Sequence, residues 1–238
     1  MILAINSSTL QYGIAILTEK GSVVTEHISP SGEKGFTGFM PVLDSLFVLS
    51  GFDRQDIKAV ITAIGPGSFT GLRVGMATAK GLAHGLKIPI IGVSSTEALA
   101  FQVSSTDLKI CSMITSRKDE VFYAVFQRDN KKQLIRLSDD TSIKLRLLTD
   151  SVKGPHLFIG NDYSAQADII YEASGGMAVL APAQMWCLKA SSVGILGLKR
   201  FQNGDFDSIR DIIPSYLRPP DIRPNPYKSV KKTESIID

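Results

Sequence analysis

Residues 59–75, AVITAIGPGSFTGLRVG, contain the pattern that decides the fold. The apolar run 59–64 predicts a buried strand, and apolar residues at helical spacing predict a helix over 70–86. A glycine-rich turn joins the two elements. Its glycines allow backbone angles that are closed to other residues, and Ser68 or Thr70 could cap the helix. A strand that passes through a tight turn into a helix indicates an α/β protein.

The glycine-rich turn has two possible roles. Free N–H groups and the helix dipole make the start of a helix a natural anion site. Such a site would consist of Gly65, Gly67, Ser68 and Thr70. The spacing matches neither the Walker A loop nor the dinucleotide fingerprint. The alternative role is a tight strand-to-helix turn that packing requires, and the sequence alone leaves both open.

The order of predicted elements recurs in the two halves of the chain. The first half has predicted strands at 2–5, 12–17, 23–28, 59–64 and 88–93 and helices at 36–49, 70–86 and 95–102. The second half has predicted strands at 110–115, 121–127, 133–137, 156–159 and 177–180 and helices at 163–173 and 188–201. Three strands followed by alternating helices and strands thus occur twice, which predicts a duplicated ribonuclease-H-like α/β fold with two lobes. We expect lobes at 1–103 and 104–218, followed by a flexible tail at 219–238 that is rich in proline and charge.

Two of the predicted helices carry very little charge. Asp44 is the only charged residue in 36–49, and Arg73 and Lys80 are the only ones in 70–86. The apolar positions of the first helix cover about half its circumference, whereas a one-sided helix needs a stripe of about 100°. The pattern therefore indicates burial from two directions, by the sheet of the same lobe and by a partner. The alternative is that later helices of the same chain cover these surfaces.

A row of small residues in the second of these helices strengthens the expectation of a partner. Gly71, Gly75 and Ala79 recur every four residues and would let another backbone approach closely, although each interior glycine costs about 1 kcal/mol relative to alanine. The predicted partner interface consists of Phe36, Phe39, Met40, Leu43, Thr70, Gly71, Arg73, Val74, Gly75 and Thr78. Without a partner, the same face is expected to pair with a second copy of the chain.

The bulk composition is that of an ordinary globular protein. The 238 residues are 44% hydrophobic and 21% charged, and the net charge of +3 is too small to imply nucleic-acid binding by itself. Cys111 and Cys187 do not make a disulfide framework, which fits a reducing compartment. The start, MILAINSST, does not resemble a signal peptide, and no run approaches 18 apolar residues. We therefore expect a cytoplasmic protein without a membrane span.

The sequence contains no recognisable set of metal ligands or nucleophilic residues. His27, His84 and His156 do not occur at metal-ligand spacing, and neither cysteine is near one of them in the sequence. Ser68 has no evident base and does not lie in a nucleophile elbow. We therefore expect no metal, no cofactor and no catalytic residue.

The run 65–100, GPGSFTGLRVGMATAKGLAHGLKIPIIGVSSTEALA, closely resembles the bacterial TsaB (YeaZ) family, and the likeness continues weakly at 117–123, 160–162 and 214–218. This resemblance implies an actin/hexokinase/Hsp70-type fold. It also implies a non-catalytic partner of the catalytic subunit TsaD, in a complex that an ATPase subunit, TsaE, joins. That complex installs threonylcarbamoyl on the adenosine beside the anticodon of transfer RNAs reading codons that start with A. Whether transfer RNA touches this subunit directly stays open.

The chain departs from the family pattern at three places. Asn6 stands where most relatives carry an acid, Thr115-Ser116-Arg117 where they carry Asp-Ala-Arg, and Phe36 where they tend to carry histidine. Actin-like phosphotransferases use a carboxylate in the first of these turns to hold Mg²⁺, and a neutral amide is a poor ligand for a divalent ion. These departures favour a scaffold role over the alternative, an ATP-dependent phosphotransferase or ATPase of the same fold.

Overall fold

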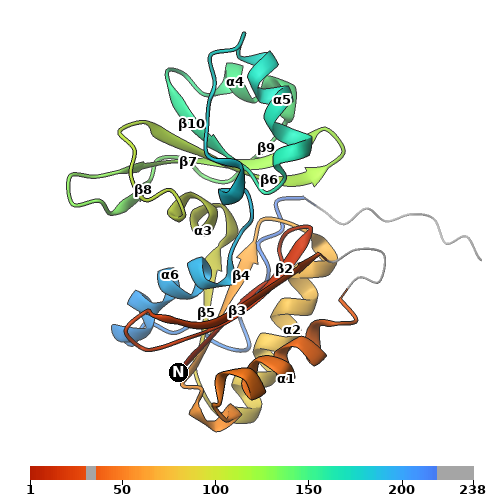
Figure 1. Ribbon diagram of the computed structural model, residues 1–238, viewed down its shortest axis with the longest axis vertical. Helices are drawn as coiled ribbons and strands as arrows, with labels where there is room; N and C mark the ends of the chain where they lie inside the picture. The colour runs from red at the N-terminus through yellow and green to blue at the C-terminus, as the bar shows by residue number, and fades with distance from the viewer. Residues whose placement is uncertain (31–35, 219–238) are drawn as a thin grey trace, which may run out of the picture.

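Two mixed β-sheets, one in each lobe, organise the computed structural model, which describes residues 1–30 and 36–218 (Figure 1). The first half contains β1 (Ile2–Asn6), β2 (Gln11–Leu17), β3 (Val23–Pro30), α1 (Phe39–Ser50), η1 (Arg54–Asp56), β4 (Ala59–Gly65), α2 (Phe69–Leu86), β5 (Ile90–Ser94) and α3 (Ser95–Phe101). The second half contains β6 (Lys109–Arg117), β7 (Glu120–Arg128), β8 (Leu134–Arg136), β9 (Thr141–Lys144), η2 (Leu145–Leu147), α4 (Leu148–Ser151), β10 (His156–Ile159), α5 (Tyr163–Ala173), β11 (Val179–Leu180), η3 (Ala183–Met185) and α6 (Ala190–Gln202). The predicted tail at 219–238 lies outside the described residues.

The two sheets repeat one topology. The first has the strand order β3-β2-β1-β4-β5, and the second has the matching order β8-β7-β6-β10-β11 with β9 paired to β7. Strand β1 pairs antiparallel with β2 and parallel with β4, and likewise β6 pairs antiparallel with β7 and parallel with β10. The central strands β1 and β4 are buried almost throughout, because helices cover both faces of the sheet. The repeat confirms the prediction of a duplicated ribonuclease-H-like fold.

Helices α1 and α2 cover the outer face of the first sheet. In α1 the buried residues Phe39, Leu43, Leu46 and Phe47 follow helical periodicity, and the helix ends at Gly51, whose φ of 71° is the left-handed conformation that glycine favours. In α2 the Ser68 side chain accepts a hydrogen bond from the Gly71 N–H and caps the helix. Both helices contribute to one hydrophobic core with β1, β2 and β4. On the second lobe, α4 and α5 lie on the outer side (Figure 1).

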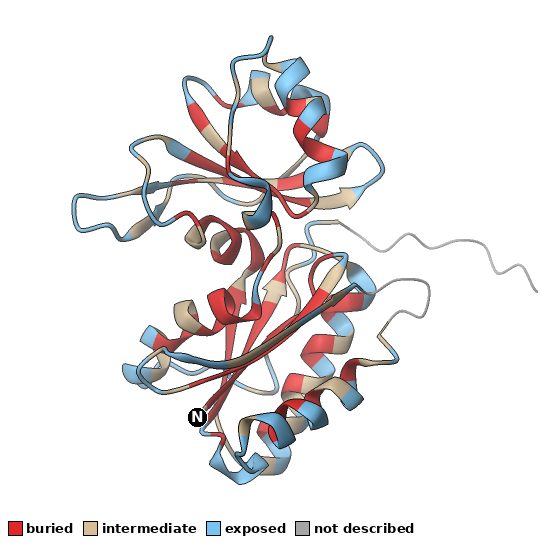
Figure 2. Ribbon diagram, in the orientation of Figure 1, coloured by how far each residue is buried: buried red, intermediate tan, exposed pale blue. Residues whose placement is uncertain are grey.

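The last helix of each half packs on the sheet of the other half. Helix α6 packs against β1, β2, β4 and β5. A β-carbon at Gly194 of α6 would lie 2.8 Å from Ala4, and one at Gly197 would lie 2.4 Å from Ile61. Helix α3 packs against β6 and β7, and the Ser112 hydroxyl donates to the Thr96 carbonyl at 2.8 Å. Both helices therefore lie between the sheets, where Figure 2 shows them mostly buried.

No helix in residues 1–30 and 36–218 is both long and apolar enough to cross a membrane.

Candidate functional site

The small-residue row of α2 packs against the turn that follows β1. A β-carbon at Gly71 would lie 1.9 Å from the Ser7 carbonyl oxygen, and one at Gly75 would lie 2.1 Å from Ser7 Oγ. The Ser7 hydroxyl itself donates to the Gly71 carbonyl at 2.8 Å. The close approach that these glycines permit is therefore used inside the first lobe. The expectation that Gly71 and Gly75 face a partner is corrected accordingly.

Two of the predicted interface residues in α1 also belong to the core. Phe39 is 1% exposed and Leu43 is 2% exposed. Phe36, just before the helix, is half-buried, and its ring lies 5.8 Å from that of Tyr12. These side chains hold α1 on the sheet, so Phe39 and Leu43 are not available to a second protein.

The rest of the predicted interface lies at or near the surface of the helix pair. Met40 is 49% exposed, Thr70 and Arg73 are exposed, and Val74 and Thr78 are half-buried. The structure adds residues that the sequence reading left out. Val48 and Leu49 of α1 are 82% and 76% exposed, and a β-carbon at Gly81 or Gly85 of α2 would meet no described atom within 4 Å. We call the following set the helix-pair surface: Met40, Val48, Leu49, Thr70, Val74, Thr78, Gly81 and Gly85.

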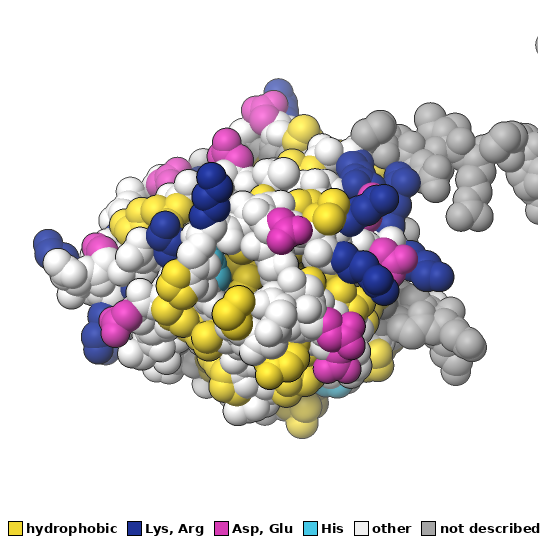
Figure 3. Space-filling view, turned by 90° about the horizontal axis from the view of Figure 1, so that it is seen from above, with side chains coloured by type: hydrophobic (Ala, Val, Ile, Leu, Met, Phe, Trp, Pro, Cys, Tyr) yellow, Lys and Arg dark blue, Asp and Glu magenta, His cyan; other side chains and the backbone are white. Residues whose placement is uncertain are grey.

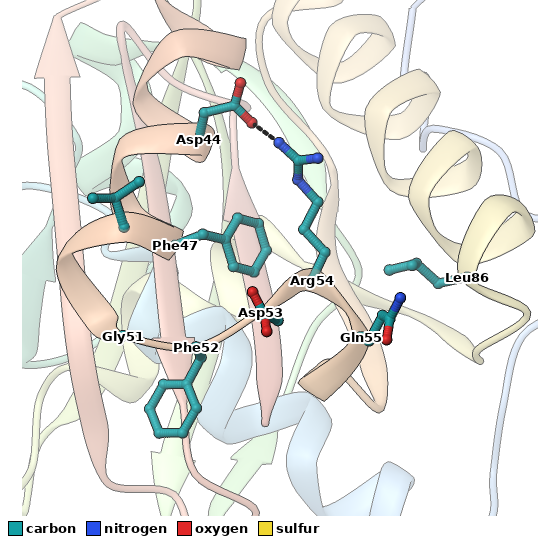
Figure 4. A pocket seen from close by; sticks show the side chains of 9 residues that line it. Asp44, Phe47, Gly51, Phe52, Asp53, Arg54, Gln55 and Leu86 are labelled. Carbon is teal, nitrogen blue, oxygen red and sulfur yellow. Dashed lines mark hydrogen bonds and ion pairs between the residues drawn. The ribbon is translucent and has the colours of Figure 1, made fainter.

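A pocket opens between the C-terminal ends of α1 and α2, beside the helix-pair surface (Figure 4). Its volume is about 870 Å³. Phe47 and Phe52 supply apolar lining, and an ion pair of 2.7 Å joins Asp44 to Arg54 across it. Leu86, at the end of α2, lines the opposite side. The pocket gives this end of the helix pair a concave shape with both apolar and polar lining, which a partner's side chain could fill.

The glycine-rich turn before α2 is engaged by the first turn of the lobe. The Ser68 N–H donates to the Ser8 carbonyl at 2.8 Å, and the Gly71 N–H donates to Ser68 Oγ at 3.2 Å. A β-carbon at Gly67 would lie 2.0 Å from the Ser8 carbonyl oxygen. Two of the N–H groups that an anion site would use are thus already bonded. This arrangement favours the packing role of Gly65, Gly67 and Ser68 over the anion site.

The two turns that would carry metal-binding acids hold neutral side chains in internal hydrogen bonds. The Asn6 side chain is fully buried, donates to the Leu188 carbonyl at 2.8 Å and accepts from Ser8 N–H at 3.0 Å and Ser8 Oγ at 2.8 Å. In the second lobe, Asn161 Oδ1 accepts from the Thr115 N–H at 2.7 Å. Both turns therefore serve the fold, and neither offers a carboxylate at these positions.

The segment that ends the described chain connects the two lobes. The Ser215 N–H donates to the Ile64 carbonyl at 2.7 Å, beside the glycine-rich turn. The Tyr216 ring lies 5.2 Å from that of Phe69, and its hydroxyl accepts from Arg73 Nε at 3.3 Å. The Arg73 guanidinium also stacks on the Phe69 ring, 3.9 Å from its centre. The start of α2 is thereby fixed to this segment.

Two residues further on, Arg218 reaches the second lobe. Its guanidinium donates to the Glu120 carboxylate and, at 2.7 Å, to the Ser142 hydroxyl. This contact holds the pKa of Glu120 below its usual value, chiefly through the hydrogen bond from Arg218. We call residues 214–218 the bridging segment, because it contacts α2 in one lobe and β7 and β9 in the other.

Residues that would suggest catalysis or metal binding stay apart. Among the described residues, no three of the His, Cys, Asp and Glu side chains are close enough to hold a metal ion. Cys111 is fully buried, and burial raises the pKa of its thiol, so it does not present a thiolate nucleophile. The hydroxyl oxygen of Ser68 accepts the hydrogen bond that caps α2.

The duplicated sheets and the helices that each half places on the other sheet define a two-lobed protein of the actin/hexokinase/Hsp70 type. Comparison with solved structures agrees: YeaZ from Pseudomonas aeruginosa superposes with a TM-score of 0.74 at 21% identity, covering 91% of this chain and 99% of that one.

Sequence comparisons identify the family. A family model described as "TsaD: tRNA N6-adenosine threonylcarbamoyltransferase" matches residues 36–175. The "tRNA threonylcarbamoyladenosine biosynthesis protein TsaB" of Bacillus subtilis is 31% identical over 91% of this chain and 93% of its own length. The protein of the same description from Escherichia coli is 26% identical over 91% of this chain and 94% of its own length. The chain belongs to the TsaB (YeaZ) family of tRNA threonylcarbamoyladenosine biosynthesis proteins.

Proposed function

We propose that this chain is a non-catalytic partner subunit in tRNA threonylcarbamoyladenosine synthesis, and that it docks onto a TsaD-type catalytic subunit through the helix-pair surface. One observation carries the docking site: Val48 and Leu49 are 82% and 76% exposed on a helix whose other face is core. Exposed apolar side chains gathered on one face are typical of protein interaction sites. Family membership indicates the process, and the match of residues 36–175 to the TsaD family indicates that the partner shares the fold.

The charges around the helix-pair surface support a protein partner. Asp44 is paired with Arg54, and Arg73 is held by Phe69 and Tyr216. Few free charges would therefore have to be desolvated on docking, and the cores of protein interfaces are depleted in charge. Gly81 and Gly85 leave open space along α2, so a partner helix could approach closely.

Further parts of the proposal follow from the same surface and the family. When the catalytic subunit is absent, the helix-pair surface pairs with a second copy, because a self-complementary apolar face forms a two-fold dimer. A TsaE-type ATPase joins through the complex. The chain itself does not hydrolyse ATP, because the side chain at position 6 is a neutral amide that is hydrogen-bonded to Leu188 and Ser8 and offers no carboxylate for Mg²⁺. The assembly works in the cytoplasm and installs threonylcarbamoyl on the adenosine beside the anticodon.

The docking surface can be tested with one pair of matched substitutions. Val48→Arg places a cation on the helix-pair surface, and Met177→Arg places one on the second lobe at a residue that is equally exposed, at 82%. Burying an unpaired cation at an interface should cost about 2–3 kcal/mol, which is a loss in affinity of about thirtyfold or more. We expect titration calorimetry against the TsaD-type subunit to show that loss for Val48→Arg and near-parent binding for Met177→Arg.

Folding does not confound this test, because both side chains are on the surface and circular dichroism melting should give parent-like curves. A folded Val48→Arg protein that binds the catalytic subunit as tightly as the parent would overturn the proposed docking site. Equal losses for both variants would indicate a non-specific charge effect and would count against it as well.

A further inference from the structure

A cluster of cations surrounds the turn between β6 and β7, on the second lobe. In the strand register, Arg117 lies opposite Glu120 across the hairpin, and Glu120 lies opposite Lys144 of β9 on its other side. Directly paired residues of neighbouring strands point to the same face of a sheet, about 5 Å apart. The two cations therefore flank one carboxylate in a row across three strands.

Two more cations lie at the ends of this row. Lys118 occupies the tip of the turn, beside Asp119. The Leu145 N–H donates to the Asp119 carbonyl at 2.9 Å, which brings η2, and with it Arg146, next to the tip. We call the cluster of Arg117, Lys118, Lys144, Arg146 and Arg218 the basic rim. Figure 3 shows Lys and Arg side chains gathered at its right-hand edge, the side on which Figure 1 places the β6–β7 turn.

The basic rim has an excess of positive charge that the described residues do not neutralise. Glu120 is already bound by Arg218, whose side chain is 28% exposed. Arg117, Lys118, Lys144 and Arg146 are exposed, and no ion pair within residues 1–30 and 36–218 includes any of the four. Like charges held this close repel one another, so an anionic partner would be attracted. Ser142, beside Arg218, adds a hydroxyl to the same face.

The chemistry of the basic rim differs from that of the helix-pair surface. The helix-pair surface is apolar with few free charges, as protein interfaces are at their centres. The basic rim instead combines exposed Arg and Lys side chains with a serine hydroxyl, and these are the groups that contact phosphates in nucleic-acid complexes. The two surfaces belong to different lobes, so both can be occupied at once (Figure 1).

We propose that the basic rim binds the phosphate backbone of the RNA on which the complex acts. The proposal rests on the proposed function, because the family's printed activity concerns tRNA. Arg117, Lys118, Lys144 and Arg146 contact phosphates, while Arg218 keeps Glu120 neutralised and holds β7 and β9 in place. The contact is independent of base sequence and positions the RNA relative to the catalytic subunit.

The test compares two double substitutions that remove equal charge. Lys118→Gln/Lys144→Gln neutralises two cations of the basic rim. Lys20→Gln/Lys109→Gln neutralises two exposed lysines elsewhere: Lys20 lies between β2 and β3, and Lys109 begins β6, about 26 Å from Arg117 along the strand. The binding of a labelled tRNA transcript to the full chain, alone and with the TsaD-type subunit, is measured by fluorescence anisotropy over a range of salt concentrations.

We expect Lys118→Gln/Lys144→Gln to weaken tRNA binding by about tenfold at 0.1 M salt and to lower the slope of log affinity against log salt by about 1.5. The control should stay within about twofold of the parent. A basic-rim variant with the parent's affinity and salt slope, or a parent chain that binds no tRNA at low salt in either form, would overturn the proposal.

The partner measurement separates this proposal from the docking proposal. If Lys118→Gln/Lys144→Gln loses the catalytic subunit but keeps tRNA, the basic rim is an acidic-protein contact and the RNA proposal is wrong. If Val48→Arg binds the catalytic subunit normally, the docking site fails while the tRNA result on the chain alone still decides the basic rim. Loss of tRNA by the basic-rim variant with normal partner binding supports the proposal.

Discussion

The Asn6 side chain donates a hydrogen bond of 2.8 Å to the main-chain carbonyl of Leu188, 182 residues further along the chain. This bond ties the first turn of the first lobe to the segment that leads into α6. It requires a donor at position 6, and a carboxylate at neutral pH is an acceptor only. The residue that a phosphotransferase would use for metal binding is therefore replaced by one that the fold needs as an amide.

Asn6→Asp should destabilise the protein and gain no activity. The buried carboxylate would face the Leu188 carbonyl without a donor, at a cost of about 3 kcal/mol in the free energy of unfolding. Burial disfavours the charged form, so the penalty should be smaller at pH 5 than at pH 8. Urea denaturation at both pH values measures it. Tight Mg-ATP binding by a fully stable Asn6→Asp protein would show instead that the turn is a latent nucleotide site.

Gly75→Ala should lower stability, whereas Gly81→Ala in the same helix should raise it. The new methyl group at Gly75 would lie 2.1 Å from Ser7 Oγ, and none of the described atoms lies within 4 Å of the one at Gly81. We expect Gly75→Ala to cost about 2 kcal/mol through overpacking and Gly81→Ala to gain up to about 1 kcal/mol from helix propensity. Chemical denaturation of the two variants side by side checks both signs. A neutral Gly75→Ala would contradict the packing of α2 against the β1 turn.

Tyr216 should contribute to stability mainly through its ring. Its contact with Phe69 and the hydrogen bond from Arg73 fix the bridging segment to the start of α2. We expect Tyr216→Ala to cost about 2 kcal/mol and Tyr216→Phe, which keeps the ring, about 0.5 kcal/mol. Thermal melting gives the order, and hydrogen exchange of the Ser215 amide should speed up in Tyr216→Ala alone. Equal effects of the two substitutions would assign the stabilisation to the hydroxyl.

The pKa of Glu120 should report the contact with Arg218. The hydrogen bond from Arg218 lowers this pKa, with smaller contributions from the charges of Arg218, Arg117 and Lys144. Since the folded-state pKa lies below the unfolded value, the contact stabilises the fold above the unfolded pKa and is lost as the pH falls through the folded pKa. Arg218→Gln should raise the pKa of Glu120 in an NMR titration of the side-chain carboxyl carbons.

Asp205 provides an internal control for that titration. Its pKa is lowered by a separate hydrogen bond from Arg200 and should not respond to Arg218→Gln. A Glu120 titration that is unchanged in the variant would mean that Arg218 does not hold this carboxylate in solution.

The sequence was sufficient to predict most of the fold, because local periodicity and turn residues agree with the final packing. The predicted strands at 2–5 and 59–64 and the helix at 70–86 match β1, β4 and α2 within one or two residues. Strand β9 and helix α4 were not predicted. Thr141–Lys144 is mostly polar and exposed or half-buried, and it becomes a strand because it pairs with β7, which is a long-range contact. Helix α4 has only four residues, too few for a periodic signal.

The candidate site was less predictable, because a sequence pattern shows which residues share a helix face but not what that face meets. The row of Gly71 and Gly75 correctly indicated a close backbone approach, yet the approaching group is Ser7 of the same lobe. Val48 belongs to the apolar positions that indicated a partner face, but only the packed structure shows that Val48 and Gly81 remain exposed. The basic rim could not be predicted from the sequence either. Its cations lie up to about a hundred residues apart, and strand pairing and the bridging segment bring them together.

The exchange of α3 and α6 means that neither half of this chain encloses its own core. Residues 1–103 alone would leave β1, β2, β4 and β5 without the helix that covers their inner face, and residues 104–218 alone would leave β6 and β7 without α3. The two halves repeat one strand order, yet each sheet is covered by a helix from the other half. We therefore expect the two lobes to unfold as one cooperative unit, so that a substitution in the core of one sheet lowers the stability of both.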